Sequence, residues 1–287
     1  MRWGPLEEGD LIDEVFLLNV MRRYNIEAVM HFAALAEVAC SVQNPLMYYR
    51  NNVSASISLL NAMDKAGISK IVFSSSDTIY GNVNAKLIPE DQPCAPISPY
   101  GYSKYFFERI LTDCVNTSNL NMIIFRYFNV AGADPDVDIG ENLNLSKRLI
   151  PRAIDVALGR SPNLQVFGNT YATPDGSCIR DYIHVCDLVD AHMLGLHNLR
   201  SGSVNKVFNL GAGRGYSIFQ IINAVETLTG TKVSVEVCDK RIGDPTHLVA
   251  DCARAQSILG WRPLRSDIET QISDALNWHN KFWGCTR

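Results

Sequence analysis

The stretch KIVFSSS, residues 70–76, decides the fold of this chain. It is a short apolar run with β-branched residues that ends in three serines, a pattern typical of a buried strand. The runs AVMHFAA (28–34) and NMIIFRYFNV (121–130) repeat that pattern before and after it. Helical patterns separate the three runs, one over 54–66 and one beginning at 99. This βαβαβ order predicts an α/β fold with a parallel sheet covered by helices.

Small or polar residues close each of these predicted strands. Ala33 and Ala34 follow the first, the serines end the second, and Phe128 and Asn129 lie at the end of the third. Ligands of open α/β sheets bind at the carboxyl ends of the strands. We therefore expect the serine run and Asn129 to face one crevice with the helix from 99, although a serine run at a strand end is by itself often only a turn.

Composition excludes several classes of protein. The 287 residues are 47% hydrophobic and 20% charged, which is ordinary for a soluble globular protein. A net charge of −4 provides no basic field for nucleic acid. The eight cysteines form no CxxC pair, so we expect reduced thiols in a cytoplasmic protein and no metal site. No apolar run reaches the length of a membrane span, and the start MRWGPLEEGD does not resemble a signal peptide.

The alternation of strands and helices loosens in the second half of the chain. Pro, Gly and Asn are frequent through RSPNLQVFGNTYATPDGS (160–177). We therefore expect a first domain over 1–147 and a smaller, more irregular lobe over 148–287, with some of the later chain returning to the first domain.

The stretch SPYGYSK, residues 98–104, places Tyr100 and Lys104 four residues apart, on the same face of the predicted helix. Ser98 is a suitable N-cap and Pro99 a suitable first helical residue, which puts Tyr100 in the first turn. A helix N-terminus and a neighbouring ammonium both favour a phenolate, so this tyrosine could take a proton from an alcohol. The alternative is a surface helix whose Tyr and Lys share a face by chance.

A glycine cluster, NLGAGRGYS at 209–217, invites a cofactor assignment. Its GxGxG spacing differs from the dinucleotide fingerprint GxGxxG, and it lies late in the chain. We predict instead a tight strand-to-helix turn, with Ser217 capping the helix and Gln220 completing a capping box. No glycine-rich loop follows a strand in the first 60 residues, where Gly9 and Asp10 are expected to close a strand.

Eight motifs follow one another along the chain: GDLID, HFAALAEV, YYRNNV, FSSSDTIYG, SPYGYSK, FRYFNVAGA, RDYIHV and RIGDP. In this order they resemble the extended short-chain dehydrogenase/reductases, and within them the nucleotide-sugar epimerases. That resemblance implies a Rossmann-type doubly wound parallel sheet that holds NAD and a smaller mixed α/β lobe that holds a UDP-sugar. It begins after the family's GxxGxxG loop, so the fold is expected to be truncated at its N-terminus by at least one βαβ unit.

The resemblance implies three catalytic side chains. Tyr100 is expected to be the base, Lys104 its cationic partner and a contact of the nicotinamide ribose, and Ser76 a hydrogen-bond partner of the sugar 4-hydroxyl. These three are also expected to contact NAD. The other cofactor contacts that the resemblance implies are Asp10, Leu11, Phe32, Ala33, Ala34, Asn51 and Phe128.

The resemblance also implies a set of contacts with the UDP-sugar. A guanidinium fork suits phosphate oxygens, although either arginine alone would more often be a solvated surface charge. His31 and His184 are expected to be structural, because the family uses no catalytic histidine. The expected substrate contacts are Ser76, Thr78, Tyr100, Asn129, Leu149, Phe167, Arg180, Arg241 and Asp244.

The activity implied by the resemblance is an isomerisation in carbohydrate metabolism. The enzyme would invert C4 of a UDP-hexose, interconverting UDP-glucose and UDP-galactose through a 4-keto sugar, with NAD as a cofactor that is not consumed. The intact family form is expected to be a cytoplasmic homodimer.

Two other readings stay open. A dehydratase of the same family usually carries an acidic pair after the Thr beside the catalytic serine, whereas Ile79 and Tyr80 follow Thr78 here. The chain could also be an inactive truncated fragment unable to hold NAD, which cofactor retention would reveal. Leu248 stands about where relatives place the residue that gates bulky 2-substituents, so acceptance of N-acetylated sugars is undecided.

Overall fold

The computed structural model describes residues 4–83, 85–202, 205–241 and 244–284. The chain forms two compact units, each described here by itself. The chain passes between the units several times, so that residues 127–147 belong to the second unit and residues 195–207 to the first. The first unit comprises Met1–Gly81, Pro93–Arg126 and Gly195–Val207, and the second comprises Asn82–Gln92, Tyr127–Leu194 and Phe208–Arg287.

The elements of the first unit are, in chain order, α1 (Glu14–Arg23), β1 (Val29–His31), α2 (Val38–Gln43), α3 (Pro45–Tyr49), the π-helix η1 (Arg50–Ser54), α4 (Ala55–Ala66), β2 (Lys70–Ser76), the 3₁₀ helix η2 (Asp77–Tyr80), α5 (Pro99–Thr117) and β3 (Asn121–Tyr127). Tyr127, the last residue of β3, already belongs to the second unit, and two further elements are divided between the units, α7 (Val185–Arg200) and β7 (Lys206–Leu210). The second unit contains β4 (Asn129–Ala131), α6 (Leu149–Ala157), β5 (Leu164–Phe167), β6 (Ile179–His184), β8 (Gly215–Ser217), α8 (Ile218–Thr229), β9 (Val235–Cys238), β10 (His247–Leu248), α9 (Ala253–Leu259) and α10 (Ile268–Phe282).

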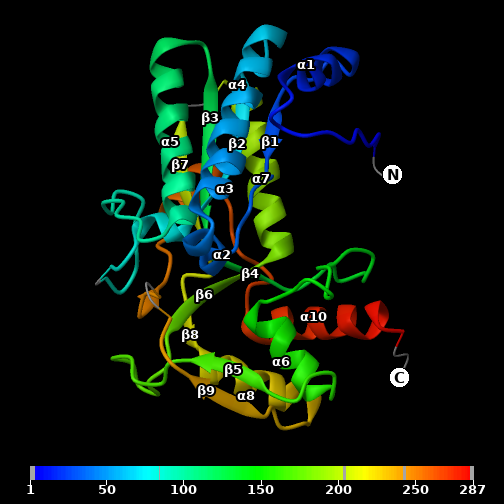
Figure 1. The fold of residues 1–287 in the computed structure, drawn as a ribbon, viewed down its shortest axis with the longest axis vertical. Coiled ribbons are helices and arrows are strands. Elements are labelled where there is room, and N and C mark those ends of the chain that lie inside the picture. Colours follow the sequence, from blue (N-terminus) through cyan, green and yellow to red (C-terminus); the bar gives the residue numbers. More distant parts are fainter. Residues whose placement is uncertain (1–3, 84, 203–204, 242–243, 285–287) are drawn as a thin grey trace. The chain divides into compact units, whose positions relative to one another are not determined.

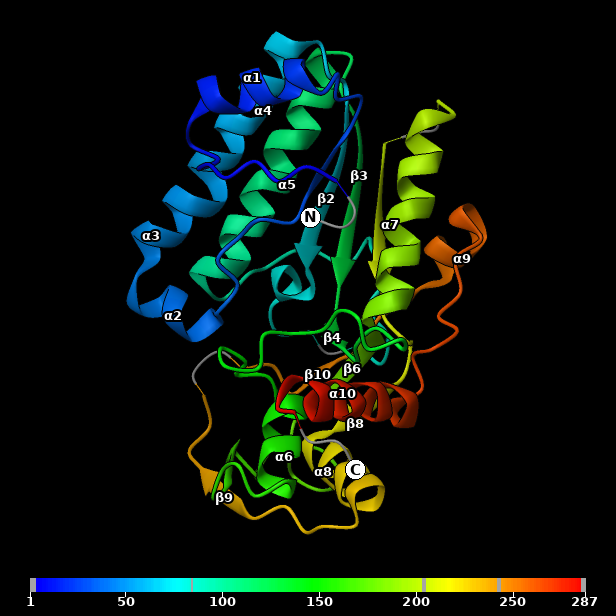
Figure 2. The ribbon, with the colours of Figure 1, turned by 90° about the vertical axis from the view of Figure 1, so that its right-hand side faces the viewer.

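The sheet of the first unit has the order β1-β2-β3-β7, and β1 pairs with β2 in parallel. Successive strand residues point to opposite faces. Phe73 of β2 turns to the α5 side, where its ring lies 4.8 Å from that of Phe107. Phe125 of β3 lies on the other face, where Gly195 of α7 leaves room for its ring. Figure 2 shows α4 and α5 on one side of β2 and β3 and the C-terminal end of α7 on the other. This arrangement confirms the α/β fold with a parallel sheet covered by helices.

The first strand is shorter than its sequence suggests, and an earlier expected strand is absent. Of the run 28–34 only Val29–His31 pairs with a neighbour. The expectation that Gly9 and Asp10 close a strand is wrong, because residues 5–10 pair with no described strand. Asp10 instead forms a turn, in which its carboxylate accepts a hydrogen bond from the backbone N–H of Ile12 at 3.1 Å. A strand exists only where a partner supplies its ladder, which residue type alone does not specify.

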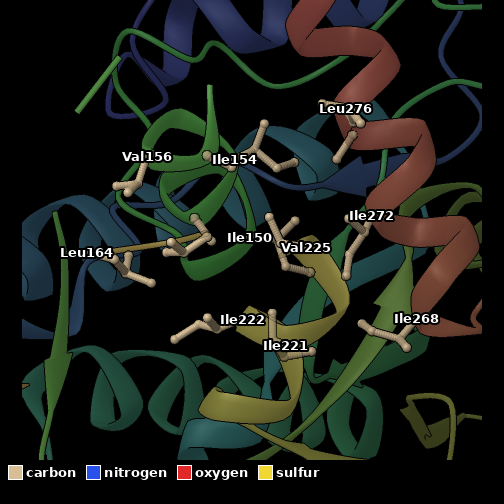
Figure 3. Close-up of a cluster of buried hydrophobic side chains, with 14 of the residues drawn as sticks. Ile150, Ile154, Val156, Leu164, Ile221, Ile222, Val225, Ile268, Ile272 and Leu276 are labelled. Atoms are coloured by element: carbon tan, nitrogen blue, oxygen red, sulfur yellow. The ribbon is translucent and has the colours of Figure 1, made fainter. Parts of the chain in front are cut away.

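The second unit is built on short sheets, and three of its helices form its main apolar core. Strand β6 pairs in parallel with β4 and β10 and antiparallel with β8, and β5 pairs in parallel with β9 (Figure 1). Helices α6, α8 and α10 bury isoleucines against one another, among them Ile154, Ile221 and Ile272 (Figure 3). None of the described helices is both long and apolar enough to cross a membrane.

The glycine cluster links β7 to α8 as the sequence predicts, but the link contains the short strand β8 and is not a tight turn alone, because Gly215–Ser217 pair with β6. β7 ends at Leu210, and α8 begins at Ile218 behind a complete capping box of Ser217 and Gln220. Gly213 adopts a φ of 71°, a left-handed conformation that favours glycine. The cluster therefore belongs to the second unit as a structural turn.

Candidate active site

The N-terminus of α5 places Tyr100 as the sequence predicts. The helix begins at Pro99, and the hydroxyl of the N-cap Ser98 accepts a hydrogen bond from the backbone N–H of Gly101 at 3.2 Å. Tyr100 lies in the first turn, is 8% exposed, and meets the ring of Tyr48 edge to face at 6.5 Å. The phenol is therefore held by a capped helix and an aromatic neighbour near the positive end of the helix dipole.

Lys104 is a buried cation one helical turn beyond Tyr100. It is 4% exposed, its ammonium donates to the carbonyl of Ser74 at 2.7 Å, and it lies 4.9 Å from the centre of the Phe73 ring. Burial lowers the pKa of Lys104 to about 8, against which the nearby carboxylate of Glu108 acts. A lysine in this setting is still mostly charged at neutral pH, as a partner of the phenol requires.

Ser76 stands where β2 becomes the 3₁₀ helix η2. Its hydroxyl caps η2 by accepting from the backbone N–H of Thr78 at 3.3 Å and from the Thr78 hydroxyl at 3.0 Å. It also donates to the carboxylate of Asp77 at 3.1 Å. Ser76 and Thr78, predicted as sugar contacts, thus share one turn at the carboxyl end of β2, the edge of a parallel sheet at which ligands bind.

The predicted cofactor contacts of the first unit lie on loops and on η1. Phe32 is 54% exposed just beyond β1, and Ala33 beside it is also exposed. Ala34 and Leu11 are half-buried, whereas Asp10 and Asn51 are exposed. An exposed phenylalanine at the carboxyl end of a parallel strand is well suited to contact a planar ligand.

Asn52, beside the predicted contact Asn51, holds this loop in place. Its side chain accepts from the backbone N–H of Leu35 at 2.9 Å and donates to the carbonyl of Leu35 at 2.9 Å and to the hydroxyl of Ser103 at 3.0 Å. Asn52 lies in the π-helix η1, a distortion often found at functional sites. The buried amide thus fixes the segment after β1 to α5, a role that the sequence did not reveal.

The described residues suit the nicotinamide ribose of NAD better than they suit its pyrophosphate. Tyr100, Lys104 and Ser76 gather at one end of the sheet, in keeping with a nicotinamide ribose there. The one glycine cluster that sequence offers for a pyrophosphate is already occupied by an internal anion. The carboxylate of Asp181 accepts from the backbone N–H groups of Ala212 at 2.7 Å and of Gly213 at 3.0 Å. The described residues therefore fit the nicotinamide end of NAD, and the backbone N–H groups of Ala212 and Gly213 are engaged by a carboxylate of the chain itself.

In the second unit, Arg180 and Asp244 form a close ion pair. Arg180, on β6 and 9% exposed, donates to the Asp244 carboxylate at 2.5 Å and to its neighbour's carbonyl, that of Ile179, at 2.8 Å. Arg241 stacks its guanidinium over the ring of Phe167 at 3.7 Å. Four of the predicted nucleotide contacts thus form two interacting pairs, and their charges also act on the pKa of one neighbour, Tyr171.

The other predicted contacts of this unit are less exposed to a ligand. Asn129 of β4 donates to the carbonyl of Asp181 on the paired strand β6 at 3.3 Å. Leu149 opens α6 and packs against the isoleucine core. Phe128 is 4% exposed, and its backbone N–H donates to the carbonyl of Leu210 at 3.1 Å. Leu149 and Phe128 therefore have clear structural roles in addition to the predicted ones.

The two histidines that were expected to be structural are buried in packed surroundings. His31 shares a hydrogen bond of 2.8 Å with Ser56, and burial lowers its pKa to about 4. In His184, Nδ1 accepts from the backbone N–H of Cys186 at 3.0 Å and Nε2 lies 3.1 Å from the Asp274 carboxylate. Burial lowers the pKa of His184 as well.

Tyr171 is a candidate contact that the sequence did not suggest. Its hydroxyl is buried and has no hydrogen-bond partner among the described residues. The ammonium of Lys240 lies 4.4 Å from the centre of its ring, and burial, followed by the Asp244 charge, raises the pKa of the phenol. Only the packing of the loop between β5 and β6 against Lys240 reveals this phenol, because nothing in the local sequence around it is distinctive.

Comparison with known proteins gives this arrangement a context. Residues 2–211 match the NAD dependent epimerase/dehydratase family. The UDP-glucose 4-epimerase of Azospirillum brasilense is 45% identical over 278 residues, which are 97% of this chain and 80% of that protein. The UDP-glucose 4-epimerase of Halalkalibacterium halodurans is 41% identical over 95% of this chain and 82% of its own length.

Solved structures agree with the sequence comparison. The UDP-glucose 4-epimerase of Brucella ovis in complex with NAD superposes with a TM-score of 0.93 at 43% identity, covering 96% of this chain and 86% of that one. The enzyme of Bifidobacterium longum in complex with NAD⁺ and UDP gives a TM-score of 0.89 at 35% identity, over 98% of this chain and 84% of that one.

Proposed function

Because the chain belongs to the NAD dependent epimerase/dehydratase family, we propose that it is a UDP-hexose 4-epimerase, with Tyr100, Lys104 and Ser76 as its catalytic side chains. The observation that carries the residue assignment is the capped N-terminus of α5, which holds Tyr100 in the first turn and a buried, mostly charged Lys104 one turn later. The identity to UDP-glucose 4-epimerases over nearly the whole chain favours this reaction over a dehydratase and over an inactive fragment.

Tyr100 moves the proton of the reaction. In the proposed reaction its phenolate takes the proton of the C4 hydroxyl, and returns it after the 4-keto sugar has turned over in the site. The neighbouring Lys104 ammonium favours the phenolate by charge, so the base is available near neutral pH. The Ser76 hydroxyl, held at the carboxyl end of β2, is assigned to the hydrogen bond that orients the 4-oxygen.

NAD, when bound, takes up and returns the C4 hydrogen with its electron pair. Lys104 would hold the nicotinamide ribose. The other residues proposed to contact the cofactor are Asp10, Leu11, Phe32, Ala33, Ala34, Asn51, Ser76, Tyr100 and Phe128. Since the cofactor leaves the cycle unchanged, the reaction inverts C4 with no net redox change.

The UDP part of the substrate is assigned to the second unit. Two guanidinium groups, Arg180 and Arg241, are proposed to hold the diphosphate and Asp244 the uridine ribose, in keeping with charge-assisted recognition of phosphate oxygens. The remaining proposed contacts of the nucleotide are Asn129, Leu149 and Phe167. In domain terms, the N-terminal part of the chain carries the catalytic groups and the part from about 148 carries most nucleotide contacts.

The test is a variant that removes only the proton carrier. The purified chain is supplied with NAD and assayed for interconversion of UDP-galactose and UDP-glucose, and UDP binding is measured by calorimetry. Tyr100→Phe should reduce turnover by about 10²- to 10⁴-fold, the usual contribution of a general base, while UDP affinity is retained.

Tyr102→Phe is the matched control, because Tyr102 is 39% exposed on the same helix and carries the same hydroxyl. It should turn over like the wild type. Turnover by the Tyr100→Phe variant at the wild-type rate would remove Tyr100 from the mechanism, and a wild type without C4 epimerisation would refute the proposed reaction.

A homodimer is the proposed assembly. Helices α2, α3 and α5 pack together in the first unit and expose large apolar side chains: Val42 is 61%, Leu46 80%, Met47 47% and Phe106 43% exposed. Side chains of this kind gathered on neighbouring helices favour association with an apolar surface, and a second copy provides an identical one.

Light scattering after gel filtration tests the dimer. Leu46→Glu should shift the molar mass from about twice that of the chain to that of one chain, because a buried charge opposes association. The control Leu264→Glu changes a leucine that is 83% exposed in the second unit and should leave the mass unchanged. A wild type that elutes as a monomer would exclude the dimer.

The seven described cysteines are all unpaired, in keeping with the proposed cytoplasmic location.

A further inference from the structure

A buried ion pair lies behind the catalytic side chains and takes no part in the proposed chemistry. Arg126 of β3 donates to the Glu108 carboxylate through Nε, at 3.1 and 3.2 Å to its two oxygens, and through a terminal nitrogen at 2.7 Å. The side chains are only 8% and 5% exposed. Taking two charges out of water is costly, and a buried pair is weak evidence for stability alone. Its position therefore calls for another explanation.

Glu108 continues the catalytic face of α5. Tyr100, Lys104 and Glu108 follow one another at intervals of four residues, so their side chains share one side of the helix. Lys104 donates to the carbonyl of Ser74 at 2.7 Å, and the hydroxyl of Ser75 donates to Glu108 at 2.5 Å. Two successive residues of β2 are thus tied to α5 directly before Ser76.

Arg126 secures the chain on the other side of Ser76. Besides Glu108, it donates to the hydroxyl of Tyr80 at 3.0 Å, and its guanidinium lies 5.2 Å from the centre of that ring. Tyr80 is the last residue of η2, the helical turn that Ser76 caps. One ion pair thus holds the segments immediately before and after the residue assigned to the sugar 4-oxygen.

We propose that Glu108 and Arg126 are positioning residues, which fix Ser76 relative to Tyr100 and Lys104, and that the Glu108 carboxylate is the counter-charge of the buried Lys104 ammonium. The inference rests on the proposed function for its catalytic consequence. Its structural part, the coupling of Glu108 to Lys104, holds independently of turnover.

The charges around Lys104 support this coupling. His31 of β1 is neutral, because burial and then the Lys104 charge lower its pKa to about 4. From β2 the Phe73 ring and the Ser74 carbonyl face the ammonium, and from α5 its neighbours at helical spacing are Tyr100 and Glu108. From β3 the Arg126 guanidinium pairs with the Glu108 carboxylate. Glu108 is the group that raises the pKa of Lys104 against burial. Without its charge, Lys104 would lose its proton at a lower pH.

Two variants separate position from charge. Glu108→Gln removes the charge and the carboxylate that receives both prongs of the Arg126 fork, whereas Ser75→Ala removes only the link to β2. Both should lower kcat by about ten- to a hundredfold, the usual consequence of a small misplacement of catalytic groups, with KM for UDP-galactose nearly unchanged. Only Glu108→Gln should also move the alkaline fall of activity to lower pH.

The control is an exposed carboxylate on the same helix. Asp113 pairs with Arg109 at 3.5 Å with both side chains about two-thirds exposed, so Asp113→Asn should change neither kcat nor the pH profile. If Glu108→Gln fails to fold, Ser75→Ala still tests position. The apolar double variant Glu108→Leu, Arg126→Met, which leaves no unpaired buried charge, then tests the loss of charge.

A second readout needs no turnover. The cost of burying the Lys104 charge is fully present below pH 8 and fades as pH rises toward 10.5, so the free energy of unfolding should rise across that interval. In Glu108→Gln the rise should begin at lower pH. An unchanged onset of this rise together with a wild-type kcat would overturn the proposal. Absence of turnover in the wild type would refute the epimerase assignment alone, and the unfolding measurement would still decide the coupling.

Discussion

At the scale of single residues, the burial of Lys104 has two opposing effects. In the proposed reaction its ammonium favours the phenolate of Tyr100, but the protein must carry a charge on a residue that is only 4% exposed. Burial lowers the pKa of Lys104 from 10.5 to about 8, which measures how unfavourable that charge is in the fold. The charge of Lys104 therefore supports the proposed activity and lowers the stability of the fold.

Lys104→Met should show both effects. Turnover should fall strongly and the pH dependence of the remaining activity should move toward alkaline values, because Tyr100 loses its cationic neighbour. At pH 7 the variant should be more stable to urea by at most about 3 kcal/mol, the equivalent of the pKa depression, with the gain fading as pH rises from 8 to 10.5. An unchanged pH profile would disprove the electrostatic link between the two residues.

Arg180 and Arg241, the two arginines assigned to the diphosphate, should differ in their contribution to UDP binding. Charge-assisted bonds to phosphate contribute about 1.5–3 kcal/mol each, so Arg180→Ala should weaken UDP binding by roughly ten- to a hundredfold. Arg241 is exposed, so Arg241→Ala should weaken UDP binding less, toward the low end of that range. Arg262→Ala, an exposed arginine of the same unit, is the control for titration calorimetry. Wild-type affinity in both Arg180→Ala and Arg241→Ala would contradict the assignment.

The sequence predicted the positions of residues that depend on neighbouring residues, and it missed the contacts between residues that lie far apart in the chain. The capped start of α5 and the spacing of Tyr100 and Lys104 follow from neighbouring residues alone, and the structure confirms them. Glu108 follows Lys104 on the same face of α5, but its partner Arg126 lies on the strand β3. Only the fold brings that pair together, and the same is true of Tyr171 and Lys240.

At the scale of elements, the contact of α5 with η2 decides how closely Tyr100 and Ser76 can be held. Gly101 permits that contact, because a Cβ there would lie 2.9 Å from the Thr78 carbonyl oxygen and 3.2 Å from the Pro96 side chain. Neither neighbour is the flexible end of a long side chain. The glycine is therefore required by close approach rather than by its backbone conformation.

Gly101→Ala should push the first turn of α5 away from η2. We expect a loss of about 1–3 kcal/mol in the free energy of unfolding, the usual cost of overpacking, and a fall in kcat larger than any change in UDP affinity. Asn116→Ala, at an exposed position on the same helix, should change neither value. Stability and kcat equal to the wild type would show that the contact is not tight.

The types of the main elements were predictable, and some of their limits were not. Periodicity identified α4, β2, α5 and β3 because each is long enough to show its repeat. The run AVMHFAA yielded a strand of only three residues, since a strand ends where its neighbour no longer pairs with it. The π-helix before α4 also escaped prediction, and the partner of its Asn52 side chain, the carbonyl of Leu35, lies 17 residues away in the sequence.

At the scale of the whole molecule, each unit combines segments from different parts of the chain. Residues 195–207 lie with the N-terminal sheet, while 82–92 lie in the second unit. Local patterns show that a segment is a strand or a helix, but they do not show which core it joins. The sequence therefore predicted that the chain has two lobes, but it did not predict which segments belong to each lobe.

Acid should destabilise the protein through its buried histidines. Burial lowers the pKa of His31 to about 4 and also lowers the pKa values of His184, His192 and His279. The unfolded chain binds these protons near pH 6.5 and the folded chain only at lower pH, so stability falls as pH drops below 6.5. The slope should approach about 1.4 kcal/mol per pH unit for each histidine.

Urea unfolding at pH 7.5, 6.5 and 5.5 checks this expectation. His31→Gln should reduce the slope, whereas His197→Gln, at an exposed position, should leave it unchanged. A free energy of unfolding that is constant or rises toward pH 5.5 would show that the histidines do not control acid stability.

The three serines that end β2 make this part of the chain sensitive to insertions and deletions. The carbonyl of Ser74 accepts from Lys104, and the hydroxyl of Ser75 donates to Glu108. The hydroxyl of Ser76 caps η2. Because the side chains of a strand alternate in direction, loss of one codon within 70–76 would move every later side chain to the opposite face. A point substitution removes one of these links, whereas such a deletion would exchange all of them at once. Natural length variation in related genes should therefore avoid β2 and accumulate in loops such as 134–147.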